Sequence, residues 1–482
     1  MSKTALIIGA GPAGLTAGYE LAKKGLKVTV LERDNIVGGI SRTIKYKGFR
    51  FDIGGHRFFS KNKEIEKWWE NILHEDFLTR PRLSRWYYRK KFFDYPIKPL
   101  ELLGVFGVID SMKIALSYAK AKIKPIIPEI SVADWCINNF GHYLAKPFFI
   151  DYNQKLWGVH PKYLSKDFTS QRVKGISVMN TLKDALKKSL GVKDTHIKSL
   201  IEQFKYPKYG PGMMWEKVTG LIEANKGKVL KGWKVIKVKH RNGKITSVIA
   251  ENKNRRKNFK ADYFLSTMPL KELVLALEPL PAEDIVGAAK FLSFRDFITV
   301  ALMIDKEKTV PDTWVYTHDE GMKPIRAQIF KNWSPFMVPD GKSCIGFEYV
   351  CNQGDELWNM SEEKLIEQAK ADLKRLGFAN PDKVFDAQVI RLKEVYPVYL
   401  IGYKERVNKI KEYLQGNFKN YCLQPIGRGG LHRYNNSDHS MMTALLAVKN
   451  ILGEGNYDPW NVNTDAEYHE EEKIKRPTSA VL

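Results

Sequence analysis

Residues 4–14 read Thr4-Ala5-Leu6-Ile7-Ile8-Gly9-Ala10-Gly11-Pro12-Ala13-Gly14, and this stretch decides the fold. A short apolar run meets a glycine-rich turn, and a helical pattern then continues to Lys24. A second apolar run, residues 27–31, follows and ends at Glu32. This order of strand, glycine turn, helix, strand and acid predicts a Rossmann-like α/β domain.

Each glycine of the turn has a physical purpose. We expect Gly9 to make the tight turn, Gly11 to let the backbone approach a diphosphate, and Gly14 to let the helix pack closely on the strand. The free amides and the dipole at the helix N-terminus favour the diphosphate, and Glu32 can accept hydrogen bonds from ribose hydroxyls. The sequence therefore predicts a bound dinucleotide. The alternative is an ordinary turn between a strand and a helix.

The segments that follow indicate which dinucleotide binds. Gly38-Gly39-Ile40-Ser41-Arg42-Thr43 and Phe51-Asp52-Ile53-Gly54-Gly55-His56 resemble segments that wrap FAD in the flavoprotein superfamily of amine oxidases, protoporphyrinogen oxidase and UDP-galactopyranose mutase. The resemblance implies FAD, with the Gly-Gly-His turn beside the isoalloxazine ring. The sequence has no second glycine fingerprint of this kind for a nicotinamide cofactor, so NAD(P)H enters only as a candidate external reductant.

Taken together, the glycine turn and this resemblance give a set of expected cofactor contacts. They are Gly9, Gly11, Pro12, Ala13, Gly14, Glu32, Arg33, Gly38, Gly39, Ser41, Gly54, Gly55, His56, Val235, Arg428, Asn436, Asp438, His439 and Ser440.

Length and charge bound the class of protein. A chain of 482 residues with 44% hydrophobic residues can form two or three globular domains. Its net charge of +24 suits an anionic substrate such as a sugar nucleotide, an anionic membrane surface or nucleic acid, and solvated lysine faces are the alternative. No nucleic-acid motif accompanies the charge, so we do not expect that partner. The four cysteines lack metal-ligand spacing, which with no expected signal peptide favours a cytoplasmic protein.

The most apolar internal stretch, residues 100–119, predicts a helix with two candidate environments. Glu101, Asp110 and Lys113 interrupt it, so it is a poor membrane-spanning segment. Lysines at positions 120, 122 and 124 follow, which allows peripheral contact with the inner face of a membrane. We favour the other interpretation, a buried amphipathic helix.

The order of motifs along the chain predicts discontinuous domains. A second glycine turn, Tyr206-Pro207-Lys208-Tyr209-Gly210-Pro211-Gly212, and a hairpin at Asn242-Gly243 precede a strand within 261–269 that returns to the first sheet. We therefore expect an FAD-binding domain from residues 1–60, 204–275 and 416–465. A mainly helical region at 61–203, a substrate-binding sheet with helices at 276–415 and a polar tail at 466–482 complete the chain.

Residues 80–98 interleave arginines with tyrosine, tryptophan and phenylalanine. Such a pattern can bind a nucleotide through stacking and charge. It equally fits a twisted edge strand whose arginine stems lie along apolar surface, and the sequence leaves both open.

Further motifs resemble UDP-galactopyranose mutases over most of the chain. They are Tyr152-Asn153-Gln154-Lys155-Leu156-Trp157, Arg326-Ala327-Gln328-Ile329-Phe330, Tyr396-Pro397 and the C-terminal stretch from Gly427-Arg428 through Arg433-Tyr434 to Asp438-His439-Ser440. Trp333 stands where that family has a tyrosine, and Ser437 replaces a glutamine. The resemblance implies substrate contacts at Tyr152, Asn153, Trp157, Trp333, Tyr396 and Tyr434, and a diphosphate held by Arg326 with Arg172 as the candidate second arginine.

The mutase resemblance implies a non-redox exchange between pyranose and furanose forms of a nucleotide sugar. Reduced FAD would act through its N5 as the nucleophile on the anomeric carbon, with His56 and Arg326 as catalytic residues. Simpler roles are a backbone-bonded turn histidine for His56 and a strand-surface salt bridge for Arg326. The alternative function is a flavin-dependent oxidoreductase of the amine oxidase or protoporphyrinogen oxidase type, which shares the first sixty residues.

Overall fold

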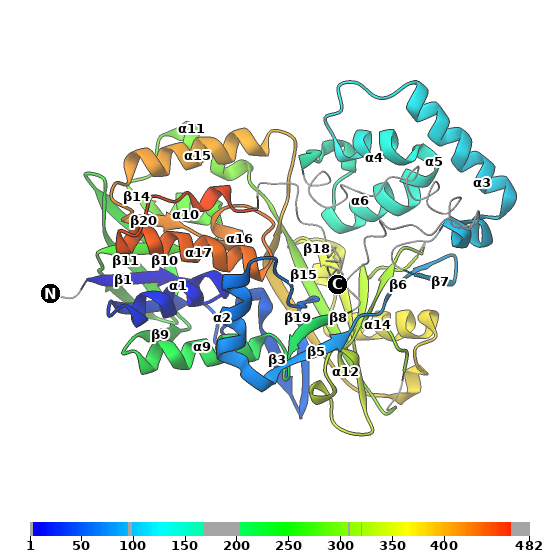
Figure 1. Ribbon diagram of the computed structural model, residues 1–482, viewed down its shortest axis with the longest axis horizontal. Helices are drawn as coiled ribbons and strands as arrows, with labels where there is room; N and C mark the ends of the chain where they lie inside the picture. Colours follow the sequence, from blue (N-terminus) through cyan, green and yellow to red (C-terminus); the bar gives the residue numbers. More distant parts are fainter. Residues whose placement is uncertain (1–2, 95–98, 168–202, 307–308, 320, 464–482) are drawn as a thin grey trace, which may run out of the picture.

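The computed structural model describes residues 3–94, 99–167, 203–306, 309–319 and 321–463. Arg172 lies outside these ranges. The described part of the chain forms a parallel sheet with helices, a large mixed sheet and a small helical lobe (Figure 1). This is the α/β class that the glycine turn predicts.

Five of the described strands form the parallel sheet, in the order β20-β13-β1-β2-β9. Their bounds are Leu423–Pro425, Tyr263–Ser266, Thr4–Ile8, Lys27–Glu32 and Lys228–Lys231. Strand β1 is central and points alternate side chains into two cores, with Ile7 on one face and Leu6 on the other. Segments that are far apart in the sequence thus complete one sheet.

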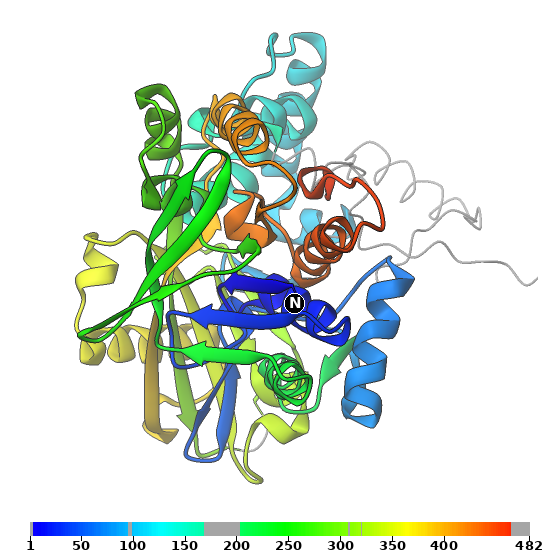
Figure 2. The same ribbon diagram turned by 90° about the vertical axis from the view of Figure 1, so that its left-hand side faces the viewer.

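Helices cover one face of this sheet and a second sheet covers the other (Figure 2). The helices are α1 (Pro12–Lys23), α9 (Gly212–Ala224) and α17 (Ser437–Leu452). The second sheet has the order β12-β11-β10-β14, with bounds Arg255–Phe259, Lys244–Asn252, Lys234–Arg241 and Leu277–Glu278. Helices α10 (Leu270–Ala276), α11 (Glu283–Phe291) and α15 (Tyr403–Asn417) contribute to the same core as this sheet.

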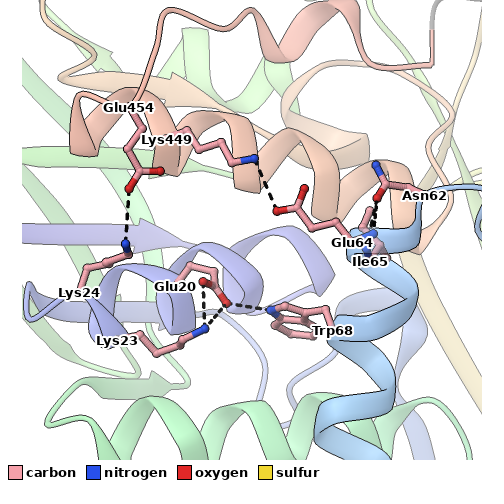
Figure 3. A network of polar contacts seen from close by, with 9 residues as sticks. All are labelled: Glu20, Lys23, Lys24, Asn62, Glu64, Ile65, Trp68, Lys449 and Glu454. Atoms are coloured by element: carbon pink, nitrogen blue, oxygen red, sulfur yellow. Dashed lines mark hydrogen bonds and ion pairs between the residues drawn. The ribbon is translucent and has the colours of Figure 1, made fainter.

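Helix α2 (Lys63–Leu73) is held against both α1 and α17 by polar contacts (Figure 3). Trp68 donates its indole N–H to Glu20 of α1 at 2.8 Å, and Lys449 of α17 lies 3.5 Å from Glu64. The Asn62 side chain caps α2 by accepting from the amides of its first turn. These contacts connect α2 to both helices.

Seven described strands form the mixed sheet, in the order β19-β15-β18-β17-β16-β6-β7. Their bounds are Val384–Pro397, Phe294–Ile304, Ser343–Cys351, Arg326–Ile329, Trp314–Thr317, Ser84–Tyr88 and Lys91–Asp94. Helix α14 (Glu362–Leu376) packs on its outer face, after α13 (Glu356–Asn359). Residues 84–94 therefore form two strands at one edge of this sheet, as the edge-strand interpretation of the basic and aromatic segment 80–98 expects, while the rest of the described part of 61–203 is mainly helical.

Two antiparallel strand pairs and two short helices are separate from these larger sheets. Strands β3 (Thr43–Tyr46) and β4 (Phe49–Asp52) form one pair, and β5 (Phe77–Pro81) with β8 (Gln203–Pro207) forms the other. Helix α12 (Phe330–Trp333) follows β17, and α16 (Gly427–Gly430) follows β20.

The helical lobe contains α3 (Pro99–Ile123), α4 (Val132–Phe140), α5 (His142–Ala145), the π-helical turn η3 (Lys146–Ile150) and α6 (Asp151–Trp157). Ser131 and Asp134 form a capping box that starts α4. Helix α3 is broken at Gly107 and exposes much of its apolar surface, so our expectation of a buried helix is wrong. None of the described helices has the length and apolar character to cross a bilayer.

Candidate active site

The glycines of the turn between β1 and α1 differ in the space around them. A Cβ on Gly14 would lie 1.9 Å from the carbonyl oxygen of Gly9, and one on Gly9 would lie 2.0 Å from Thr267 Oγ1. A Cβ on Gly11 would meet nothing nearer than the Gly39 Cα at 3.8 Å. Gly9 and Gly14 are thus required by the protein's own packing, whereas Gly11 and Gly39 border the N-terminus of α1.

Glu32 lies at the carboxyl end of β2, next to this turn. Its carboxylate accepts from the Ala10 amide at 2.7 Å and from the Asp34 amide at 2.9 Å. Burial raises the pKa of the Glu32 carboxyl, while these amides act in the opposite direction. A buried acceptor beside a helix N-terminus fits the ribose and diphosphate of FAD.

Two other expected cofactor residues flank Glu32. Arg33 lies at the surface and pairs with Glu394 at 3.4 Å. Val235, on β10 of the second sheet, has a buried side chain that packs in the core. Pro12 and Ala13 form the first turn of α1, and Gly38 donates its amide to the Ala10 carbonyl at 2.8 Å.

The turn that contains His56 is fixed from both sides. Asp52, at the end of β4, accepts from Thr43 at 2.7 Å and from the Tyr206 hydroxyl. Thr43 in turn accepts from the Gly212 amide at 3.0 Å, which joins the second glycine turn to this hairpin. Burial raises the pKa of the Asp52 carboxyl to about 7.

His56 is neutral and has a defined tautomer. Its Nε2–H donates to the Ile53 carbonyl at 2.8 Å, which leaves Nδ1 as an acceptor 3.5 Å from Ser41 Oγ. Burial lowers the pKa of His56 to about 4, and the positive charges of Arg428 and Arg326 act in the same direction. The backbone bond is the simpler role considered for this histidine. The effect of the two guanidinium groups on this pKa also shows that His56 lies close to Arg428 and Arg326.

The C-terminal stretch meets this turn at the start of α17. Ser437 Oγ lies 3.2 Å from Ser41 Oγ, and α17 begins at Ser437 after the N-cap residue Asn436. Asp438 and Ser440 are buried in its first turn, and burial raises the pKa of the Asp438 carboxyl. His439 Nδ1 lies 3.5 Å from the Asp438 carboxylate. The helix N-terminus therefore points a positive dipole end at the turn that contains Ser41.

Arg326, whose side chain is 17% exposed, forms an ion pair with the fully buried Glu348 on the neighbouring strand of the mixed sheet. Its Nε and Nη2 contact Glu348 Oε2 at 2.8 and 2.7 Å, and Gln328 donates to the other Glu348 oxygen. Burial acts to lower the pKa of Arg326, but Glu348 and neighbouring tyrosines hold it well above its usual value. Arg326 Nη1 lies 3.3 Å from where a Cβ on Gly55 would stand. The salt bridge is therefore internal and adjoins the Gly-Gly-His turn.

Three tyrosines and a second arginine complete the cluster. Tyr396 and Tyr434 stack in parallel with ring centroids 5.5 Å apart, and the Arg428 guanidinium lies 4.6 Å from the Tyr434 ring centre. The backbone carbonyls of Asn435 and Val395 hold Arg428 at 2.8 and 3.3 Å. Within the described residues Arg428 has no carboxylate partner. Tyr152 is partly buried near Arg326, and loss of contact with solvent raises the pKa of its hydroxyl.

The remaining predicted substrate residues support this cluster from behind. Trp157 packs edge-on against Tyr396 at 6.3 Å and donates to the Asn153 side chain at 3.2 Å. Trp333 is only 1% exposed and lies behind Gly55, where a Cβ would be 3.4 Å away. A side chain without an exposed face holds the turn in position, so direct substrate contact by Trp333 is corrected to a supporting role.

Sequence reasoning missed three residues of the site. Tyr316 lies 5.9 Å from the Arg326 guanidinium, Glu348 pairs with it, and His318 stacks on Tyr152 at 4.2 Å. A signal for Glu348 was present, because it is the one carboxylate in the otherwise apolar strand Ser343–Cys351. A lone carboxylate in a fully buried strand predicts a cationic partner.

Comparisons with known proteins define the class. The family model of flavin containing amine oxidoreductases matches residues 12–397. The chain belongs to this family, which implies FAD as its cofactor.

Individual relatives are similar over short segments of sequence or through the fold. An L-amino-acid oxidase of Crotalus adamanteus is 32% identical over 113 residues, or 20% of this chain and 22% of that protein. A 1-hydroxycarotenoid 3,4-desaturase of a Flavobacterium species is 46% identical over 56 residues, or 12% of each chain. The matched segments thus span less than a quarter of these relatives' lengths.

Solved structures are similar over nearly the whole chain. A reduced UDP-galactopyranose mutase has a TM-score of 0.81 at 22% identity, covering 96% of this chain and 99% of its own. A putative protoporphyrinogen oxidase from Exiguobacterium sp. 255-15 has a TM-score of 0.70 at 17% identity, covering 94% and 100%. At these identities the likeness shows the fold alone.

Proposed function

We propose that this protein is an FAD-dependent sugar-nucleotide mutase. The observation that carries the proposal is the convergence of Arg326 and Arg428, with Tyr152, Tyr396 and Tyr434, beside the Gly-Gly-His turn. Arg428 has no carboxylate partner among the described residues, so its charge disfavours a cationic amine and attracts a diphosphate. Arg326, which is paired with Glu348, adds a second guanidinium held in one orientation. The fold likeness to a UDP-galactopyranose mutase is in accord with this assignment.

In this proposal FAD, when bound and reduced, supplies the nucleophile for the anomeric carbon of the sugar. Arg326 and Tyr434, with Tyr396, hold the diphosphate through its departure and return. Glu348 keeps the Arg326 fork in one orientation, so less freedom is lost when the substrate binds. Neutral His56 adds no third positive charge at the turn and offers Nδ1 as an acceptor.

Flavin-dependent oxidation is the second candidate function, and two observations favour it. The curated sequence matches include an amino-acid oxidase and a desaturase. The parallel Tyr396–Tyr434 pair also presents an aromatic surface that suits an apolar substrate. An amino-acid carboxylate could use Arg326 as well as a diphosphate does, so a carboxylate substrate must be tested beside the nucleotide sugars.

The test compares ligands on the FAD-loaded protein by isothermal titration calorimetry. The panel contains UDP, UDP-hexoses, TDP-hexoses, L-amino acids and primary amines. We expect binding of one nucleotide-sugar class, and weaker binding of that class after Arg428→Gln. Binding of amino acids or amines with no nucleotide-sugar binding would favour the oxidoreductase.

A further inference from the structure

Helix α3 presents an apolar face to solvent after its break at Gly107. The exposed side chains are Val108 at 74%, Ile109 at 71%, Met112 at 60%, Leu116 at 69% and Ile123 at 85%, with Ile127 at 82% in the loop that follows. We call these six residues the apolar face. Most lie three or four residues apart, so one side of the helix bears them. An exposed apolar stripe of this kind marks an interaction surface.

The opposite side of α3 is firmly attached to the lobe. The Tyr143 hydroxyl donates to Asp110 at 2.8 Å, and its amide donates to Ser117 Oγ at 3.0 Å. The Asn138 side chain binds both backbone groups of Ile126, at 2.8 and 3.0 Å. The helix and the loop after it are thus held in place with their apolar face outward.

Basic residues border the apolar face. Lys120 and Lys124 are exposed, Lys113 pairs with Asp110 at 3.3 Å, and Lys122 donates to the Asn138 carbonyl at 2.8 Å. The turn between β6 and β7 adds Arg89, which also pairs with Asp110 at 3.2 Å. The nearby acids do not offset this charge, because Asp110 is shared by two cations and Glu129 lies near Lys166 at 3.8 Å.

We propose that the apolar face docks the protein on a bilayer surface rich in anionic lipids. Apolar side chains with a lysine border match the acyl region and the charged headgroups of such a surface. A second copy of this chain is a poorer occupant, because a self-paired face would bring two lysine borders together. Docking would also bring the lobe that holds Tyr152 and Trp157 to the membrane surface.

The experiment is sedimentation of the FAD-loaded full chain with vesicles. One vesicle type is phosphatidylcholine and the other contains about one third phosphatidylglycerol. Two variants remove the proposed contacts, Met112→Glu/Leu116→Glu and Lys120→Glu/Lys124→Glu. Matched controls change equally exposed residues far along the chain, Leu280→Glu and Lys253→Glu/Lys260→Glu. Retained FAD absorbance and an unchanged circular dichroism spectrum verify folding.

We expect the unmodified protein to sediment with the anionic vesicles and not with phosphatidylcholine alone. Each Lys→Glu change should lower the vesicle affinity at least about fivefold, because it removes one attraction and adds a repulsion. The apolar pair should abolish binding, and both controls should bind normally. The proposal is overturned if the protein ignores anionic vesicles or if the apolar pair binds like the control. Sedimentation velocity provides a second test. If the unmodified protein is a dimer and the Leu116→Glu variant is a monomer, the apolar face is a dimer interface and the proposal is overturned. None of these outcomes depends on the substrate of the flavin site.

Discussion

Arg326 and Glu348 form the contact on which the proposed function rests most directly. Arg326→Gln alone leaves the Glu348 carboxylate buried without its cation, which should cost about 3–5 kcal/mol of stability. The double change Arg326→Gln/Glu348→Gln removes both charges and should recover most of that loss. We expect nucleotide-sugar affinity to stay at least about tenfold reduced in the double variant. Thermal melting and calorimetry measure the two quantities separately.

The double variant distinguishes the two roles considered for Arg326. If stability and ligand affinity both return, Arg326 is a structural ion pair and no more. Glu348→Gln alone is the control that keeps the guanidinium in place.

His56 provides a prediction in pH. Because its pKa lies at about 4 in the folded protein, His56 stays neutral throughout the range from pH 5 to pH 8. We therefore expect kcat/KM to show no inflection near pH 6.5 that depends on this residue. His56→Asn should lower kcat without changing the shape of the profile. An inflection between pH 6 and 7 that vanishes in His56→Asn would show that the imidazole titrates during catalysis.

At the scale of one element, the glycines of the turn after β1 have two different roles, close packing within the protein and binding of the cofactor. A Cβ on Gly14 collides with the Gly9 carbonyl, whereas a Cβ on Gly11 has room within the protein. We expect Gly14→Ala to destabilise the protein. Gly11→Ala should melt normally but bind FAD at least about tenfold more weakly, because the added methyl occupies the space of the diphosphate. Flavin fluorescence titration measures the affinity.

Gly220→Ala, in the middle of α9, is the matched glycine control. Nothing lies within 4 Å of the added methyl, so this change should raise stability by up to about 1 kcal/mol and leave FAD binding unaltered. Normal FAD affinity in Gly11→Ala would mean that this turn does not hold the diphosphate.

Local sequence patterns predicted which residues form helices and strands better than they predicted whether each element faces the core or solvent. The glycine turn and the strand within 261–269 each follow from residues close in sequence. The apolar stripe of α3 has the same spacing whether a core or solvent faces it, so periodicity could not reveal its exposure. The partner of Arg326 likewise follows from strand pairing, which places Glu348 directly across from it.

At the scale of the whole molecule, buried neutral histidines lower the free energy of unfolding when the pH falls. Burial lowers the pKa of His432 from 6.5 to about 4. Above pH 6.5 His432 is neutral in both the folded and the unfolded chain, so it does not lower the free energy of unfolding. As the pH falls from 6.5 toward 4, the unfolded chain binds a proton on this histidine before the folded chain does, and the free energy of unfolding decreases. From pH 7.5 to pH 5 this loss amounts to about 2 kcal/mol. His432→Gln should lose that much less than the unmodified protein over the same interval in urea unfolding, and an equal loss in both would contradict the assignment.

The central claim is that the FAD-loaded protein isomerises a nucleotide sugar without net oxidation. The most direct measurement incubates the dithionite-reduced protein, without oxygen, with the nucleotide sugar that binds best and follows the sugar by NMR. We predict a ring-contracted isomer in many turnovers per flavin, no oxidised product and no activity with oxidised flavin. Absence of any isomer across the UDP- and TDP-hexose panel, together with flavin reduction by an amine or amino acid and oxygen uptake, would contradict it.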